Sequence, residues 1–488
     1  MNEPLTLGID LGTGGVRAMV ATADGRIVAQ NAVANETKLS REEGRHEQLP
    51  HDWWQNVREC LGGVVEELKR SGFRTSQVQG MAVDGTSGTL VALDANDQPV
   101  RPAIMYNDPR PSGEALILND LARSWCERAG YRFEPSFALA KIMWMARNEE
   151  QHFVRAARFV HQADYIVGQL TGDFGVTDYS NALKTGYDLI EEKWPAWMTE
   201  LPGVTERLPR VVAPGAPVGT VTERAAEATG LPVGLTVLAG ATDGVAAAVA
   251  AGVRKTGDYN TTLGTTLVFK GVTERLMRDP QGLIYSHKLP GGKWLPGAAS
   301  NTGSSWIRAW FGAAPPAELD RAAREFLPGR LVGYPLVGRG ERFPFQHADA
   351  ERFMLPDPVD ANEAFAGFLV GTAIVERLAY EVLDSACGTT GGAVYSTGGG
   401  SKSDVWMQCR ADVTQRVLHR PAVAESAFGS TILAAAGTVF SSLAEATAAM
   451  AKTAHSFAPE TKNAAQYDDL FRKFRAELER RGYLAAPP

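Results

Sequence analysis

Short apolar runs alternate with amphipathic stretches along the first 110 residues, a pattern typical of an α/β domain. Residues 5–10 (LTLGID) and 16–24 (VRAMVATAD) are expected to be strands, and Asp24-Gly25 predicts a hairpin return. Residues 51–72 place apolar side chains at helical spacing and end in glycine, so they predict a helix that stops at Gly72. A further strand, a Gly/Ser turn and another strand are expected over residues 78–99, which together predict an α/β core with mixed strands.

The pattern starts again near the middle of the chain, after a mostly helical region over residues 115–200. Residues 235–253 read as a buried strand, a turn holding Asp243 and an Ala-rich helix. The stretch TTLGTTLVF (261–269) then repeats the strand, L-G-T turn and strand of GIDLGTGGVRAMV (8–20). We therefore expect a duplicated core that faces itself across a cleft, with domains at residues 1–250 and 251–488.

Composition and charge exclude several classes of protein. The 488 residues carry a net charge of −7 and no block of Lys or Arg, so nucleic acid and anionic membranes are not expected partners. No uncharged apolar run approaches the roughly 20 residues of a membrane span, and the N-terminus does not resemble a signal peptide. The four cysteines lack metal-ligand spacing and are expected to be reduced thiols, which predicts a cytoplasmic protein.

The glycine-rich stretch after the first predicted strand fits none of the common phosphate loops. A Walker A loop needs a lysine that is absent here, and a dinucleotide fingerprint needs a third glycine and a following helix. What remains is a tight hairpin whose N–H groups and Thr13 hydroxyl can face an anion. Asp10 at its mouth would suit a phosphate only with a divalent cation between them, because Mg²⁺ prefers oxygen ligands. An ordinary glycine hairpin is the alternative.

Two further turns of this kind follow, the L-G-T-T turn at residues 263–266, about 20 residues after Asp243, and a triple glycine. Asp243 follows an apolar strand and opens a helix, which suits either a simple helix cap or a site beside an anion. The triple glycine in STGGGSKSDVW lies between a predicted strand and a predicted helix, where backbone can approach a planar or phosphorylated ligand. Three such turns with aspartates in two half-repeats are more specific than any one of them.

The order and spacing of these motifs resemble the FGGY family of carbohydrate kinases, within the actin-like ATPase fold. The matching stretches include GIDLGTGGVRAMV, MAVDGTSGTLVALD, AGATDGVAAAVAAG, TTLGTTLVF and STGGGSKSDVWMQCRADV, and they cover nearly the whole chain. The resemblance implies an α/β fold of two RNase H-like domains, of the actin and hexokinase type, with an active-site cleft between them. It also implies ATP and Mg²⁺ as cofactors, with the sugar and the first phosphate motif in the N-terminal domain and ATP binding in the C-terminal domain.

The resemblance implies a role for each motif residue in turn. Asp243 would be the general base for the sugar hydroxyl, and Asp10 would hold Mg²⁺, with Asp243 as a second metal contact. Thr13 and Gly14 would contact the γ-phosphate, which makes Thr13 part of the catalytic set, and Asp84 would bind sugar hydroxyls. The remaining nucleotide contacts would come from the second domain: Gly264 and Thr265 at the β/γ-phosphates, and Gly399, Gly400, Ser401 and Asp404 beside the adenosine.

The identity of the sugar rests on a smaller set of residues. In IMYNDPR, Asn107 stands where glycerol and xylulose kinases of the family usually have tryptophan. The stretches DGTSGT, YND and SNALKTGYD resemble a plant and cyanobacterial branch that acts on D-ribulose, so transfer to the terminal hydroxyl of D-ribulose is the first expectation. Asn107 and Lys184 are candidate sugar contacts beside Asp84 and Asp243, although Lys184 equally suits a structural role.

Other functions stay open as alternatives. A D-xylulose kinase or another ketose or polyol kinase of the family would use the same motifs. An actin-like conformational ATPase is the alternative from another class, and a catalytically dead sugar-binding relative is a third. A homodimer is a possible assembly.

Overall fold

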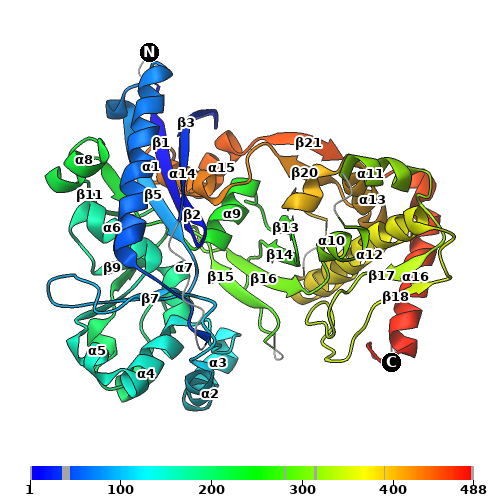
Figure 1. The fold of residues 1–488 in the computed structure, drawn as a ribbon, viewed down its shortest axis with the longest axis horizontal. Coiled ribbons are helices and arrows are strands. Elements are labelled where there is room, and N and C mark those ends of the chain that lie inside the picture. The colour runs from blue at the N-terminus through cyan, green and yellow to red at the C-terminus, as the bar shows by residue number, and fades with distance from the viewer. Residues whose placement is uncertain (1–2, 36–43, 280–281, 313–315, 389–390, 485–488) are drawn as a thin grey trace. The chain divides into compact units, whose positions relative to one another are not determined.

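A computed structural model describes residues 3–35, 44–279, 282–312, 316–388 and 391–484. The chain forms two compact units, drawn with their elements labelled in Figure 1. The first unit comprises residues 1–254, 287–293 and 423–452, and the second comprises residues 255–286, 294–422 and 453–488. This division differs from the single cut near residue 250 that the sequence suggests, because two later segments return to the first unit.

A six-stranded mixed sheet forms the centre of the first unit, in the order β11-β12-β5-β1-β2-β3. The strands β1, β2 and β3 form an antiparallel meander, β1 pairs in parallel with β5 and β5 with β12, and β11 closes the edge antiparallel to β12. Their bounds are β1 (Leu5–Gly12), β2 (Gly15–Thr22), β3 (Ile27–Ala34), β5 (Val78–Gly85), β11 (Pro217–Thr220) and β12 (Thr236–Leu238).

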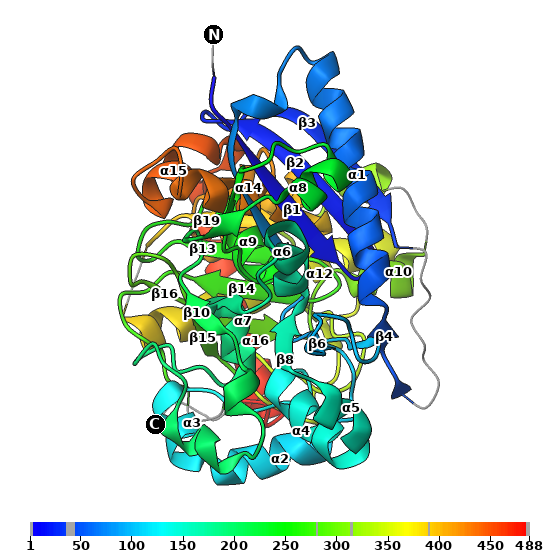
Figure 2. The same ribbon diagram turned by 90° about the vertical axis from the view of Figure 1, so that its left-hand side faces the viewer.

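The two faces of this sheet are covered by different helices, because successive side chains of a strand point to opposite sides. Leu7 and Ile9 of β1 pack in one core with α1 (Pro50–Arg70). On the other face, Met19 and Ala21 of β2 pack with α9 (Asp243–Ala251), α14 (Ser426–Ala436) and α15 (Leu443–Met450). Figures 1 and 2 show α1 and α14 on opposite sides of β1.

The other elements of the first unit surround this core. A second sheet has the order β4-β7-β6-β8, and a short pair joins β9 and β10. These strands and the remaining helices are β4 (Glu47–Gln48), β6 (Leu90–Leu93), β7 (Ala103–Ile104), β8 (Arg158–His161), β9 (Val176–Asp178), β10 (Arg210–Val212), α2 (Ser112–Leu121), α3 (Arg123–Ala129), α4 (Ala138–Asn148), α5 (Glu150–Arg155), α6 (Gln162–Thr171), α7 (Tyr179–Ala182) and α8 (Glu223–Thr229).

The second unit is built on a seven-stranded sheet in the order β15-β16-β14-β13-β19-β20-β21. β13 pairs antiparallel with β14 and β14 with β16, β13, β19 and β20 run parallel, and β21 lies antiparallel at the edge. The bounds are β13 (Tyr259–Leu263), β14 (Leu267–Gly271), β15 (Tyr285–Lys288), β16 (Trp294–Ser300), β19 (Val394–Thr397), β20 (Leu418–Pro421) and β21 (Thr453–Phe457). The order β16-β14-β13-β19-β20-β21 therefore matches the order β3-β2-β1-β5-β12-β11 of the first sheet, with the same parallel and antiparallel pairs. This match confirms the predicted duplication of the core.

The helices α12 (Ala361–Cys387) and α13 (Asp404–Thr414) pack on each other in the second unit. Arg410 and Glu376 join them through hydrogen bonds of 2.6 and 2.8 Å, and both side chains are fully buried. The remaining elements are α10 (Ser305–Phe311), α11 (Pro316–Arg324), α16 (Ala464–Arg480), β17 (Val332–Tyr334) and β18 (Phe353–Leu355).

Candidate functional site

Three aspartates lie at the carboxyl ends of the parallel strands of the first sheet. Asp10 of β1 is directly opposite Asp84 of β5 in the parallel register. A bridge between Gly85 and Thr242 brings the end of the β12 segment to the same edge, so Asp243 follows immediately. Ligands of open α/β sheets bind at such strand ends. The structure thus brings together the three aspartates that the motifs single out.

Burial and mutual repulsion govern the charges of this cluster. Asp84 is completely buried and Asp10 is 7% exposed. Desolvation, followed by the charge of Asp10, raises the pKa of Asp84 well above its ordinary value. Desolvation also raises the pKa of Asp10, against the lowering effects of Asp84 and of Arg17, which lies 3.6 Å away. The cluster therefore favours a positive charge or a hydrogen-bond donor as its occupant.

A hydroxyl group on α14 fixes the buried carboxyl of Asp84. Ser430 Oγ donates a hydrogen bond of 2.6 Å to Asp84 Oδ2. Asp84 Oδ1 is fully buried and makes no hydrogen bond with an N–H or a hydroxyl group in the described part of the chain. The carboxyl of Asp84 also shares a hydrogen bond with that of Asp10, in which Asp84 holds the proton, in keeping with its raised pKa.

Asp243 is the first residue of α9, where the helix dipole favours a negative charge. Its Oδ1 accepts a 2.6 Å hydrogen bond from the Gly244 N–H. Two hydrogen bonds fix the backbone at this point. The Thr242 N–H donates to Ser180 Oγ at 2.9 Å, and Ser426 Oγ on α14 donates to Asp243 O at 3.2 Å. The carboxylate is therefore held at the sheet edge by backbone contacts on both sides.

The β1–β2 hairpin presents its turn beside Asp10. Gly12 pairs with Gly15, which leaves Thr13 and Gly14 as the two turn residues. The turn is braced by a 3.0 Å hydrogen bond from Gln48 Nε2 to Thr13 O. Gly14 is exposed, and a Cβ at its position would meet no atom within 4 Å. The backbone of this turn is thus open to a ligand, as a phosphate contact requires.

The two candidate sugar contacts have different surroundings. Lys184 is buried, and its Nζ donates to Ser136 Oγ at 3.4 Å and lies 4.1 Å from the centroid of the Phe137 ring. A Cβ at Gly88, in the loop after Asp84, would lie 2.2 Å from Ser136 O, so this loop and the Lys184 contact share one neighbour. Asn107 is exposed and lies in the segment between β7 and α2.

The glycine turns of the second unit also meet at one sheet edge. Thr262 of β13 pairs in parallel with Thr397 of β19, so the turn after each strand lies on the same side. Gly264 O is bonded by both the N–H and the hydroxyl of Ser304, each at 2.7 Å. Thr265 lies in the same turn, between β13 and β14.

The triple-glycine loop approaches this turn closely. A Cβ at Gly398 would lie 2.5 Å from Leu263 O, and its φ of 84° also requires glycine. A Cβ at Gly400 would lie 2.4 Å from the Leu263 side chain, whereas one at Gly399 would meet no atom within 4 Å. Glycine is therefore needed at Gly398 and Gly400 for packing, while Gly399 leaves an open backbone.

Arg420 ties the loop to the start of α13. It donates from Nε to Ser401 O at 2.6 Å and from Nη2 to Asp404 Oδ1 at 2.7 Å. The four residues predicted beside the adenosine therefore lie in one short loop and helix start. Arg420 itself, which lies at the end of β20, was not part of the sequence prediction.

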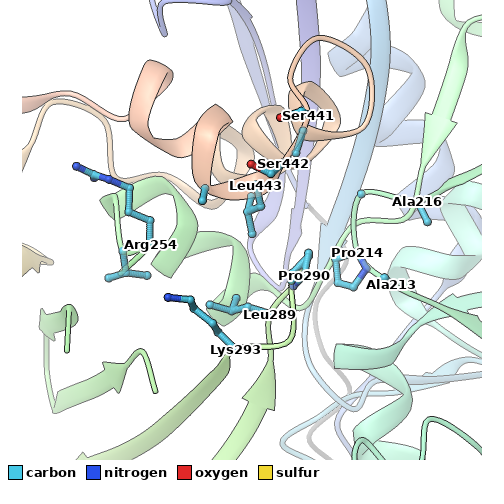
Figure 3. A pocket seen from close by; sticks show the side chains of 15 residues that line it. Ala213, Pro214, Ala216, Arg254, Leu289, Pro290, Lys293, Ser441, Ser442 and Leu443 are labelled. Carbon is cyan, nitrogen blue, oxygen red and sulfur yellow. The ribbon is translucent and has the colours of Figure 1, made fainter. Parts of the chain in front are cut away.

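A pocket of about 500 Å³ opens elsewhere in the first unit, beside α15 (Figure 3). It is lined mainly by apolar groups, with Arg254, Lys293 and the hydroxyls of Ser441 and Ser442 among them. No aspartate or glutamate lines it. Because transfer to a hydroxyl group needs a carboxylate beside the nucleophile, we place the candidate site at the aspartates instead.

Neither a metal-binding cluster of three or more residues nor a membrane-spanning helix is present among the described residues. In that part of the chain, no group of three or more His, Cys, Asp or Glu side chains has a metal-binding arrangement. Likewise, no helix there is both long and apolar enough to cross a membrane. All four cysteines are free thiols, as the sequence predicts.

Residues 5–250 match the N-terminal domain of the FGGY family of carbohydrate kinases, and residues 246–438 match its C-terminal domain. The chain belongs to the FGGY family. It is therefore a sugar kinase, with the two-domain α/β fold of that family.

Individual relatives show how near the match is. The chain is 28% identical to the xylulose kinase of Bacillus subtilis strain 168, over 95% of both chains. It is 31% identical to the xylulose kinase of Streptomyces coelicolor, over 86% of this chain and 85% of that protein. The crystal structure of xylulose kinase from Rhodospirillum rubrum superposes with a TM-score of 0.85 at 27% identity, covering 97% of this chain and 98% of that one.

Proposed function

We propose that this kinase transfers the γ-phosphoryl group of ATP to the terminal hydroxyl of a pentulose, with D-xylulose as its acceptor. The observation that carries the proposal is the trio of Asp10, Asp84 and Asp243 at one sheet edge, beside an open glycine turn. The naming of both relatives as xylulose kinases supports xylulose over other sugars. D-Ribulose, which the DGTSGT motif favours, is the second candidate.

In this proposal the first unit binds and activates the sugar. Asp84, which the parallel register places beside Asp10, is the candidate contact for a sugar hydroxyl. The carboxylate of Asp243 takes the proton of the attacking sugar hydroxyl. The oxygen of that hydroxyl bonds to the γ-phosphorus, while the bond between the γ-phosphorus and the bridging oxygen of ADP breaks. Asn107 and Lys184 remain candidate sugar contacts. Asp243 is half-buried, which leaves its carboxylate within reach of a substrate.

The residues that we propose as nucleotide contacts come from both units. We propose that Thr13 and Gly14 donate hydrogen bonds to the γ-phosphate, and that Gly264 and Thr265 bind the β/γ-phosphates. Gly399, Gly400, Ser401 and Asp404 would flank the adenosine, and the open backbone at Gly399 suits close approach of a ligand.

The donor set of the first unit also suits a magnesium ion. Carboxylate oxygens are the ligands that Mg²⁺ prefers, and the clustered negative charge at Asp10 and Asp243 would be relieved by a cation. Asp10 and Asp243 would hold the ion, directly or through water. When bound, Mg²⁺ neutralises charge on the phosphates during transfer.

A coupled assay of ADP release tests this function with D-xylulose, D-ribulose, L-ribulose and glycerol as acceptors. We expect ATP turnover to depend on sugar and kcat/KM to be highest for D-xylulose. A preference for D-ribulose would reverse the order of the two candidates. Turnover that does not depend on any sugar would instead support a conformational ATPase and refute the proposal.

The variant Asp84→Ala tests the sugar contact separately. We expect it to raise KM for the pentulose far more than KM for ATP, because the lost carboxyl is the candidate sugar contact. Equal changes in the two constants would contradict a role of Asp84 in sugar binding.

A further inference from the structure

A buried carboxylate of the second unit, Glu341, lies against the loop that follows β16. Its side chain is 3% exposed, and its backbone exchanges two hydrogen bonds with His347, each of 2.9 Å. The loop, residues 300–304, runs from the last residue of β16 to the residue that caps α10. Because the backbone of Glu341 is paired in this way, its carboxylate has a fixed place from which to hold the loop.

The two oxygens of the Glu341 carboxylate bind successive residues of this loop. Oε1 accepts hydrogen bonds from the N–H groups of Asn301, at 2.6 Å, and Arg342, at 2.9 Å. Oε2 accepts from the hydroxyls of Ser300, at 2.9 Å, and Thr302, at 3.0 Å. Residues 300, 301 and 302 are therefore all bonded to one side chain that comes from a distant part of the sequence.

The chemistry of these contacts makes them strong. Tyr334 of β17 adds a further hydroxyl, which donates to Oε2 of Glu341 at 2.9 Å. Burial, followed by the negative charge of Glu341, raises the pKa of Tyr334 above its ordinary value, so the tyrosine keeps its proton and remains a donor. Hydrogen bonds to an ionised acceptor are roughly twice as strong as those between neutral groups. The carboxylate therefore holds the loop more firmly than neutral side chains would.

The next two residues of the loop rest on the turn between β13 and β14. A Cβ at Gly303 would lie 2.3 Å from Thr265 O and 2.6 Å from the carbonyl carbon of Thr265. Ser304 donates from its N–H and from its hydroxyl to Gly264 O, each at 2.7 Å. The turn is thus supported by residues that directly follow those held by Glu341.

The turn has little room to move independently of this support. On its other side, a Cβ at Gly398 of the triple-glycine loop would lie 2.5 Å from Leu263 O. Backbone packed at such distances transmits a displacement to its neighbours because there is no void to absorb it. A shift of residues 300–302 would therefore be passed through Gly303 to Gly264 and Thr265.

We propose that Glu341 is a positioning residue for the phosphate chain of the nucleotide. It holds residues 300–302 so that the turn at Gly264 and Thr265 keeps the form that binds the β/γ-phosphates. The inference rests on the proposed function of that turn. Since a different loop, residues 399–404, is proposed to flank the adenosine, loss of the Glu341 contacts should weaken binding of the outer phosphates and spare the rest of the nucleotide.

The test compares Glu341→Gln with Glu363→Gln in the full-length enzyme. Glu341→Gln keeps the size of the side chain but replaces one acceptor oxygen with an NH2 group, which cannot accept from the loop donors. Glu363 is the matched control, because it is also buried in the second unit and accepts from Arg330 and from the Val359 N–H near the start of α12. Calorimetric titration gives Kd for ADP and for AMP, and ADP release gives KM for ATP and for the pentulose.

For Glu341→Gln we expect Kd for ADP and KM for ATP to rise about tenfold, as for loss of a hydrogen bond to a charged group. Kd for AMP and KM for the pentulose should stay within about twofold of wild type, because neither ligand has a β- or γ-phosphate. Glu363→Gln should leave the ratio of Kd for ADP to Kd for AMP unchanged. A merely structural role for Glu341 would not move this ratio.

Thr302→Val decides the matter if Glu341→Gln does not fold. It removes one hydroxyl donor to the carboxylate and keeps the shape of the side chain. We expect a rise of about threefold in the ratio of Kd for ADP to Kd for AMP, in the range of a single hydrogen bond. An unchanged ratio in this variant would contradict transmission through the loop.

The remaining outcomes separate this role from the proposed function. An unchanged ratio in Glu341→Gln, or an equal shift in Glu363→Gln, would overturn the role of Glu341, while sugar-dependent turnover by the wild type still supported the kinase. Wild-type enzyme that binds ADP no more tightly than AMP would refute the phosphate contacts of the turn, and with them the role of Glu341. If wild-type turnover needs no sugar, the proposed function fails, but the titrations with ADP and AMP still decide the role of Glu341.

Discussion

Asp243→Asn is the sharpest perturbation of the proposed chemistry, because the structure predicts that it preserves the fold. The Asp243 Oδ1 accepts a hydrogen bond from the Gly244 N–H, and an asparagine oxygen can accept the same bond. The capping position of α9 is Thr242, so the helix start does not depend on the Asp243 charge alone.

The expected energies differ between stability and catalysis. Loss of a negative charge at a helix N-terminus costs about 0.3–1 kcal/mol. Removal of its repulsion toward the buried Asp84 offsets part of that cost, because the Asp243 charge raises the pKa of Asp84. We therefore expect the free energy of unfolding to change by less than about 1 kcal/mol. Loss of a general base lowers kcat by about 10²–10⁴, which corresponds to about 3–5 kcal/mol in the barrier.

The assay follows ADP release with saturating sugar and ATP, beside calorimetric titration of ADP. Asp164→Asn is the matched control, since it is another buried aspartate of the same unit and lies outside the three-aspartate cluster. We expect the control to keep its kcat and both variants to bind ADP within about threefold of wild type. A kcat of Asp243→Asn within tenfold of wild type would refute the assignment of the base.

Three predictions concern stability. Burial raises the pKa of Asp164 from 3.8 to about 8, so between these values the folded chain holds a proton that the unfolded chain releases. The free energy of unfolding should therefore fall as pH rises from about 4 to 8. In Asp164→Asn, urea unfolding measured at several pH values should show a smaller fall of this free energy with pH. Gly8→Ala would place its Cβ against backbone of Ala427, so we expect a loss of about 1–3 kcal/mol or more, and an unchanged urea midpoint would contradict the close packing. Arg410→Met leaves Glu376 buried without its partner, and thermal unfolding should show a loss of about 3–5 kcal/mol in the second unit, unless Glu376 is replaced as well.

Local signals predicted much of the fold correctly. The glycine turns and apolar alternation placed β1, β2, β13 and β14, and helical spacing placed α1, whose observed ends lie within two residues of the prediction. Turn type and periodicity are encoded within a few residues, so they are legible without tertiary information. The repeated motif also predicted the duplicated sheet, because each half must bury the same pattern.

Contacts between distant segments could not be predicted in the same way. Nothing in the apolar stretch around Ser430 distinguishes its hydroxyl from that of Thr431, and the same holds for Ser180 behind Thr242. The helix pattern shows only that this segment is buried. Which of its side chains meets Asp84 depends on the register of a helix against a strand some 346 positions away.

The amino-acid sequence by itself determined the strands, the turns and the aspartates placed at their ends, because these follow from backbone preferences and short periodicities. Only the tertiary structure decided that Asp10 and Asp84 face each other, through the parallel register of β1 and β5. It also decided that residues 423–452 return to the first unit and set Ser430 on Asp84. The physical reason is that burial of apolar surface favours contact between segments that are far apart in the chain. Which segments meet, and in which register, depends on how the side chains of the whole unit pack together.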